Sequence, residues 1–421
     1  MNSLFRKLFV VLFLLAVILS SFSCSLANST STAITTSPGE VVYWEILYPA
    51  NFEPARVKNL DATAVASGSR LDVAITGLDY GIALKSDGTV WYWVSQGGGN
   101  QQDNAKASQV SGLKDITAIS TGFGNSLALD SDGIVWSWGN NYNGQFGIGT
   151  TGGGDQPQGT TTVPGTTSPP TIQQPVQVNN LDNVIAISSG LQHCLALKSD
   201  GTVWAWGDNG WGQLGDRTTI DRYIPTQVKN LEGIIAISAG HYHSLALKSD
   251  GTVWAWGDNE SGELGNGMTS NSYIPVQVEG LKKVTAIAAG EAHSLALRSD
   301  GTVWSWGNNE NGQAGNGSQN TKENPAVVTP VKVSNLKNVT AIAEGGTPGG
   351  GESIPGAIVK YGAGYCLALE SDGTVWGWGA TVAYLESWLQ TFNSKPQEVA
   401  GLSGVNAISG GGYYAAAIKN Q

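Results

Sequence analysis

Apolar and polar positions alternate along this chain in short segments that are separated by polar turns. Near the middle of the chain, an apolar run is followed by two alternating segments, which are joined by the dipeptide Asp250-Gly251. Alternation with a period of two predicts half-buried strands, and Asp-Gly between them predicts a hairpin whose two turn residues both have positive φ. The unit is predicted to contain four antiparallel strands that form one blade, at 226–228, 234–237, 244–248 and 252–256.

This unit recurs along the chain. The hexapeptide Ser-Asp-Gly-Thr-Val-Trp, with a second tryptophan two residues later, is repeated at intervals of 50 residues where nothing is inserted. Its copies begin at Ser86, Ser131 (with Ile in place of Thr), Ser199, Ser249, Ser299 and Ser371. A repeat of this length indicates one supersecondary unit used many times, and 57 glycines and 15 tryptophans among 421 residues fit short strands joined by tight turns.

The two ends of the chain together supply one further unit. Residues 405–409 and 414–419 match the second and third strands of the unit, and residues 41–44 match its fourth strand. We therefore predict an all-β fold, a seven-bladed β-propeller of four-stranded blades whose seventh blade is closed by N- and C-terminal strands. Closure of the ring removes open strand edges.

Three motifs resemble the repeat of a known family. The segments GHYHSLAL at 240–247, VWAWG at 253–257 and GQLG at 212–215 resemble the repeat of the regulator of chromosome condensation (RCC1-type) family, and the resemblance extends over residues 41–419. It implies a seven-bladed propeller. Because one fold carries many unrelated functions, the resemblance leaves the activity open.

The N-terminal segment has the layout of a secretory signal. Two basic residues precede the apolar run 8–19, which is too short to span a bilayer. Two processing routes stay open, namely cleavage after Ala27, or lipid modification of Cys24, whose surroundings resemble a bacterial lipobox. The chain is thus divided into a signal peptide (1–27), a flexible tether (28–39) and the propeller (40–421).

The charge of the chain narrows the choice of partners. The formal net charge is −11, and loss of the two basic residues of the signal makes it −13. This balance disfavours nucleic acid and anionic membrane surfaces as partners, so that membrane contact is expected only through a lipid at Cys24. We expect an exported monomer, extracellular or associated with the cell envelope.

The cysteines and histidines fit structural roles. Cys194 and Cys366 occupy the same position in two repeats on opposite sides of the ring, too far apart for a disulfide, and are predicted to be buried thiols. Another position alternates between His, Tyr and Asn and is predicted to form a hydrogen-bonding ring rather than a metal site. Its residues are Tyr80, Asn125, His193, His243, His293, Tyr365 and Tyr414. We find no catalytic residues and predict no cofactor and no metal.

One face of the propeller carries most departures from the repeat. We call it the variable face, and it holds connections such as 238–243 and the glycine-rich loop that begins at Gly257; the opposite hairpin face holds the Asp-Gly turns. The variable face also receives the insertions at 150–171, 346–361 and 380–394, the last with a short amphipathic helix predicted from Leu385, Trp388, Leu389 and Phe392. Candidate partner-binding residues are Tyr142, Trp211, His241, Tyr242, Tyr273, Trp388 and Phe392. The alternative is that these aromatic side chains pack the loops onto the propeller.

The sequence therefore favours a non-enzymatic scaffold that binds an unknown protein through the variable face. Other functions stay open. The resemblance implies a guanine-nucleotide exchange factor acting on a small GTPase, as in the founder of the family, or an inhibitor of a secreted enzyme of the β-lactamase type, as in an exported bacterial relative. Exposed aromatic rings would also suit a glycan-binding protein, whereas glycan hydrolysis would need paired carboxylates that the sequence does not place together.

Overall fold

The computed structural model describes residues 28–29, 39–45, 55–68, 78–96, 105–151, 174–319, 326–346, 364–381, 391–412 and 414–420. Within these ranges every regular element is a strand. None of the described residues belongs to a helix that is long and apolar enough to cross a membrane. The predicted signal peptide, Cys24 and most of the predicted tether lie outside the described residues.

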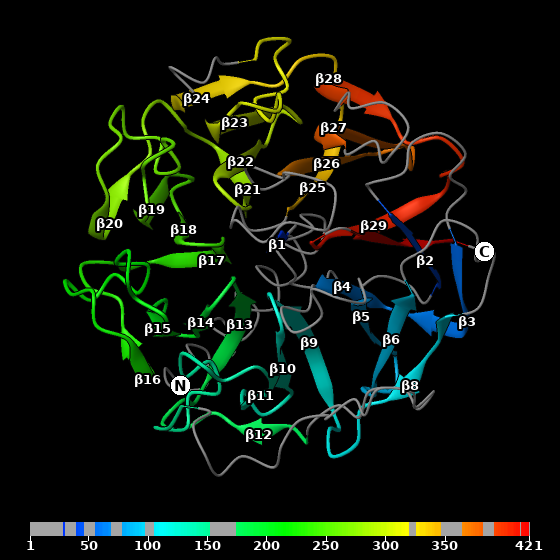
Figure 1. Cartoon of the computed structure of the whole chain (residues 1–421), viewed down its shortest axis with the longest axis vertical. Coiled ribbons are helices and arrows are strands. Elements are labelled where there is room, and N and C mark those ends of the chain that lie inside the picture. The colour runs from blue at the N-terminus through cyan, green and yellow to red at the C-terminus, as the bar shows by residue number, and fades with distance from the viewer. Residues whose placement is uncertain are drawn as a thin grey trace, which may run out of the picture.

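Seven sheets are arranged around a central axis, so the predicted seven-bladed propeller is confirmed (Figure 1). We number the blades in chain order and give their strands from the axis outward. Blades 1 and 2 consist of β4 (Ala64–Gly68), β5 (Leu78–Leu84), β6 (Val90–Gln96) and β8 (Ser108–Gln109), and of β9 (Ile116–Thr121), β10 (Asn125–Asp130), β11 (Val135–Gly139) and β12 (Val176–Gln177). Blades 3 and 4 consist of β13 (Val184–Ser189), β14 (His193–Lys198), β15 (Val203–Gly207) and β16 (Arg222–Gln227), and of β17 (Ile234–Ala239), β18 (His243–Lys248), β19 (Val253–Gly257) and β20 (Ser272–Gln277).

The remaining three blades complete the ring. Blades 5 and 6 consist of β21 (Val284–Ala289), β22 (His293–Arg298), β23 (Val303–Asn308) and β24 (Ala326–Lys332), and of β25 (Val339–Gly345), β26 (Tyr365–Glu370), β27 (Val375–Thr381) and β28 (Thr391–Glu398). Blade 7 joins both ends of the chain, with β29 (Val405–Gly410) and β30 (Tyr414–Lys419) beside β2 (Gly39–Glu45) and β3 (Ala55–Ala62), as predicted. Two short strands pair in parallel with this framework, β1 (Asn28–Ser29) with β21 and β7 (Ala105–Lys106) with β3.

Each blade takes its outer strand from the next repeat, which corrects the predicted grouping of 226–256 into one blade. The strand predicted at 226–228 belongs to β16, which pairs with β15 of the preceding repeat through Trp204 and Gln227. The loop between β15 and β16 is long enough to reverse the chain, so β16 lies antiparallel to β15. The chain then crosses to β17 of the next blade. One sequence repeat therefore contributes its first strand to one blade and its other three strands to the next blade.

The Asp-Gly turns differ from the predicted two-residue type. Gly251 has a φ of 78°, whereas Asp250 is not among the described residues with positive φ. The Gly251 amide donates to the carbonyl of Lys248 at 2.9 Å, which closes a three-residue loop of a type I turn followed by a left-handed glycine. The carboxylate of Asp250 accepts hydrogen bonds from the amide and hydroxyl of Thr252 at 2.9 and 2.6 Å. This side chain explains why Asp, Gly and Thr recur together.

The paired tryptophans occupy two different environments. The second tryptophan of each pair is buried between adjacent blades, and the indole of Trp256 donates to the carbonyl of Gln213 in the preceding blade at 2.8 Å. The first tryptophan is half-buried, with the ammonium of Lys248 lying 5.7 Å from the ring centre of Trp254. Since the same bond recurs at Trp206, Trp306 and Trp378, the second tryptophan connects the blades around much of the ring.

Candidate functional site

A belt of buried polar side chains surrounds the axis, which confirms the predicted hydrogen-bonding ring. Side chains at or near the start of the second strand reach into the next blade. These bonds join Asn125 Nδ2 to Cys194 Sγ at 3.3 Å, His193 Nε2 to Ser244 Oγ at 3.0 Å, His243 Nε2 to Ser294 Oγ at 2.9 Å and His293 Nε2 to Cys366 Sγ at 3.1 Å. The hydroxyls of Tyr80 and Tyr365 donate to the carbonyls of Asn125 and Gly411. The side chain of Tyr414 lies outside the described residues.

Burial fixes the protonation state of this belt. It lowers the pKa of His193 and His243 to about 3, so both imidazoles are neutral at pH 7. Burial also raises the pKa of the Cys194 thiol to about 12, and both Cys194 and Cys366 are buried and free of disulfides, as predicted. The belt therefore holds the blades together through hydrogen bonds between neutral groups.

The loops between the first and second strands of the blades enclose a cavity of about 50 Å³ on the axis. Its volume admits a small number of water molecules, since each needs about 10–15 Å³ on this measure. Successive loops are bonded to each other, as where the His241 amide donates to the carbonyl of Gly290 at 3.0 Å. A Cβ atom on Gly190 would lie 2.3 Å from the carbonyl oxygen of Gly240, so these close approaches require glycine.

Three of the predicted binding residues form an aromatic cluster on the variable face. Trp211 comes from the loop between β15 and β16, and His241 and Tyr242 come from the loop between β17 and β18 of the next blade. The rings of Trp211 and Tyr242 lie 6.1 Å apart, and those of His241 and Tyr242 lie 6.4 Å apart in an edge-on arrangement. Burial lowers the pKa of His241 to about 4, so the cluster is uncharged at pH 7. An uncharged, partly exposed aromatic cluster is suited to contact with another protein.

Two further predicted residues come from blades 2 and 4. Tyr142 is 62% exposed in the segment between β11 and β12. Tyr273 lies near the start of β20 rather than in a loop, which corrects its predicted place, and it is exposed. Its ring also packs on Gly212, where an added Cβ atom would lie 2.2 Å from the ring. Tyr273 therefore supports the loop that holds Trp211 while leaving part of its ring exposed.

The remaining two predicted residues lie in the third insertion. Trp388 is outside the described residues, as are most of the insertions at 150–171 and 346–361. Phe392 lies in strand β28, with its backbone paired to Ala380, so the predicted helix is wrong at this residue. Pairing with β27 gives the backbone of this segment hydrogen-bond partners that outweigh the apparent helical spacing of its apolar residues.

Sequence reasoning missed several exposed apolar side chains of the variable face. Ile220 and Met268 are 63% and 61% exposed, and Tyr223 and Ile224 of β16 are also exposed. Together with Tyr142, Trp211 and Tyr273 they extend over blades 2, 3 and 4, and we call this set the aromatic arc. Alignment of 222–227 with 272–277 could have revealed part of it, because both segments carry Tyr-Ile-Pro after a polar residue.

Sequence reasoning also missed Glu344, a buried carboxylate in the first strand of blade 6. His293, Glu344 and Cys366 bring three potential metal-ligand atoms within 4.8 Å of one another. In the described blades 2 to 5 the position of Glu344 is occupied by the small residues Thr121, Ser189, Ala239 and Ala289. This departure could have been found by aligning the first strands of the repeats.

Comparison with known proteins agrees with the fold. Residues 25–348 match the family model for the RCC1-like domain. Prp20p from Saccharomyces cerevisiae, a protein with binding properties to Gsp1p and histones, has a crystal structure that matches this chain with 20% sequence identity, 94% coverage of each chain and a TM-score of 0.66. Human WBSCR16 shares 19% identity over 91% of this chain and 100% of that chain, also with a TM-score of 0.66.

A shorter sequence match points to the same type of repeat. The human E3 ubiquitin-protein ligase HERC2 is 50% identical over 50 residues, which amount to 11% of this chain and 1% of the ligase. The match has the length of one repeat, so it indicates a shared structural unit and carries no information about ligase activity.

Proposed function

Since the chain belongs to the RCC1-like domain family, whose propeller fold suggests a protein-binding scaffold or a regulator of the exchange-factor type, we propose that it binds a protein partner through the variable face. The observation that carries this proposal is the aromatic arc with the cluster of Trp211, His241 and Tyr242. Exposed apolar side chains gathered over adjacent blades are the feature expected of an interaction surface.

Capture of a partner with matched variants tests the proposal. The full chain carrying a photo-crosslinker would be incubated with the envelope and secreted fractions of its host, beside the variant Tyr142→Ala/Trp211→Ala. The control variant Ile185→Ala/Ile235→Ala removes two exposed apolar side chains at the other ends of their strands, near the hairpin face. Capture by the wild type and the control, and its loss in the variant, would support the variable face. Equal capture by all three chains would refute it.

The exchange-factor function is the main competing proposal. The fold similarity to Prp20p, which is described as binding Gsp1p, is the observation that favours it. It predicts faster nucleotide release from a small GTPase in the presence of the full chain, measured with a fluorescent nucleotide. An inhibitor of a β-lactamase-type enzyme would instead slow substrate hydrolysis, and a glycan-binding protein would retain oligosaccharides on an array.

We also propose that the protein is exported, with residues 1–27 as its signal. The support is the basic and apolar layout of this segment. N-terminal sequencing and the intact mass of the protein from its host distinguish a mature chain that starts at Asn28 from one that starts at a lipid-modified Cys24. Recovery of the intact signal segment on protein in the cytoplasm would contradict export.

A further inference from the structure

Glu344 places a carboxyl group in the interior of the propeller, between blades 5 and 6. Its side chain is fully buried, and neither carboxylate oxygen has a hydrogen-bond partner among the described residues. Burying an unpartnered carboxylate is costly, so such a residue takes up a proton, pairs with polar groups or binds a cation. Gly290 leaves room for it, because a Cβ atom there would lie 2.5 Å from Glu344 Oε2.

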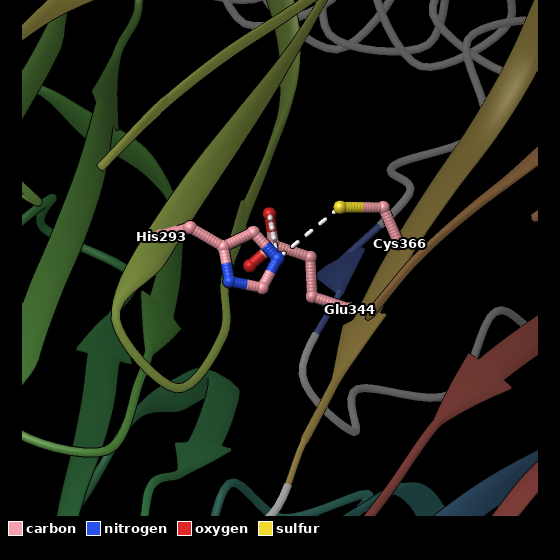
Figure 2. Close-up of side chains that lie close together, drawn as sticks. All are labelled: His293, Glu344 and Cys366. Atoms are coloured by element: carbon pink, nitrogen blue, oxygen red, sulfur yellow. Dashed lines mark hydrogen bonds and ion pairs between the residues drawn. The ribbon is translucent and has the colours of Figure 1, made fainter. Parts of the chain in front are cut away.

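Two other ligand-forming side chains point toward the same space (Figure 2). His293 Nε2, from β22, lies 3.7 Å from Glu344 Oε1 and 3.1 Å from Cys366 Sγ of β26. Around a tetrahedral Zn²⁺, bond lengths near 2.0–2.1 Å to nitrogen or oxygen and 2.3 Å to sulfur place nitrogen and oxygen ligands about 3.3 Å apart and nitrogen and sulfur ligands about 3.6 Å apart. These two separations differ from the tetrahedral values by roughly half an ångström or less. The third pair, a Glu344 carboxylate oxygen and Cys366 Sγ, lies within 4.8 Å, so the side chains must draw together when an ion binds.

The neighbouring blades provide internal controls for this arrangement. At the next junction toward the N-terminus, the three equivalent positions hold His243, Ala289 and Ser294, and the histidine simply bonds to the serine. At the junction between blades 5 and 6, alanine is replaced by Glu344 and serine by Cys366. Each exchange replaces a residue that ligates metal poorly or not at all by one that ligates it well. Both exchanges occur next to His293, the counterpart of His243. A hydrogen-bonding belt by itself requires neither exchange.

We propose that His293, Glu344 and Cys366 bind a divalent cation of the Zn²⁺ class between blades 5 and 6. Imidazole, thiolate and carboxylate together suit this borderline-soft ion, and the two anionic ligands balance its charge. Glu344 also lines the axial cavity, from which a water molecule would supply the fourth ligand. The ion connects β22 of one blade to β25 and β26 of the next, as a non-covalent staple across the blade junction.

Zinc and cobalt binding by the purified full chain tests this site. The wild type is expected to retain about one equivalent of Zn²⁺ after dialysis, measured by mass spectrometry of the metal, and to give a Co²⁺–thiolate charge-transfer band with Co²⁺. The variant Glu344→Ala/Cys366→Ser carries the residues of the neighbouring junction and is therefore expected to fold, but to lose both signals. The single variant Cys366→Ser retains the carboxylate and is expected to lose the thiolate band.

A matched control separates this site from other thiols. Cys194→Ser changes the equivalent cysteine of blade 3, which lacks the neighbouring carboxylate, and should leave the zinc content and the cobalt spectrum unchanged. Failure of the folded wild type to bind either ion stoichiometrically would overturn the proposal. Equal binding by the wild type and the double variant would overturn it as well. Chelation should lower the melting temperature of the wild type and not that of the double variant.

Discussion

Glu263 is a buried carboxyl group at a position that other repeats fill with an uncharged amide. Its side chain is buried in the loop between β19 and β20, and its Oε2 atom accepts a hydrogen bond from the Ser261 amide at 2.9 Å. The amide oxygen of Gln213 accepts the same bond from Trp211 in the preceding blade. The equivalent residues of the other repeats with this loop are Gln145, Gln213 and Gln313. Glutamine thus fits the site without any change of shape.

The difference between the two residues lies in their second polar atom. In blade 3, Gln213 Nε2 donates to Asp208 Oδ2 at 2.6 Å. In blade 4 the equivalent aspartate is Asp258, and Glu263 has no amide with which to bond to it. Burial, followed by the charge of Asp258, raises the pKa of Glu263 to about 8. The folded protein therefore keeps Glu263 protonated at neutral pH.

This proton makes stability depend on pH. Between the ordinary glutamate pKa of 4.5 and the folded value of about 8, the unfolded chain has released the proton that the folded chain still holds. The folded state then binds more protons, so its stability falls as the pH rises, by about 1.4 kcal/mol per pH unit. From pH 5 to pH 8 the loss reaches about 4 kcal/mol, and above the folded pKa it grows no further.

Glu263→Gln removes this titration and should stabilise the protein increasingly toward alkaline pH. Urea unfolding followed by tryptophan fluorescence at pH 5, 6, 7 and 8 measures the free energy of unfolding of the variant and the wild type. Their difference is expected to widen by about 4 kcal/mol over this range, whereas the exposed control Glu232→Gln should show little change. A difference that stays constant from pH 5 to pH 8 would show that folded Glu263 is ionised throughout, and would refute the reasoning.

Two further predictions concern the integrity of the ring. Trp256→Ala removes a buried indole and its hydrogen bond to the Gln213 carbonyl, and should lower the free energy of unfolding by about 3–5 kcal/mol; Trp254→Ala, at a half-buried ring, should cost clearly less in the same urea titration. Deletion of β2 (Gly39–Glu45) removes the third strand of blade 7 and should lower the melting temperature sharply in calorimetry, whereas unchanged melting would mean that the ring closes without this strand.

The sequence predicted the number of blades because its repeats carry the pattern that builds them. The buried Trp256 and the alternating residues of β18 recur at a fixed period, and packing between blades depends on both. The composition of blade 7 was also predictable, because strands at both ends of the chain matched the missing parts of the unit. The recurrence of these residues can be read along the chain, whereas the burial of five consecutive residues of β18 corrects the half-buried strand that the alternation predicted.

Other features depend on contacts that the chain does not encode locally. β16 could pair with a strand of its own repeat or of the preceding one, and its sequence fits either choice. The dipeptide Asp250-Gly251 is compatible with a two-residue turn and with a three-residue loop, and the φ of Asp250 distinguishes the two. The aromatic cluster joins Trp211 to Tyr242 across two blades. Glu344 was missed because a single carboxylate in an apolar strand indicates a metal site only when His293 and Cys366 of other strands are seen to lie beside it.

The shared outer strand has a consequence for cutting the chain into pieces. A break between β15 and β16 would leave one fragment with an incomplete blade 3 and the other with a spare strand that fits nowhere in its own blades. The exposed edge of β15 in one fragment would then regain its hydrogen-bond partners only by pairing with β16 of the other fragment. Breakage at these loops should therefore yield mutually dependent halves that reassemble from separate polypeptides, a property suited to split reporters. Breakage between β16 and β17 would leave blades 1–6 whole and would divide blade 7, whose strands come from both ends of the chain.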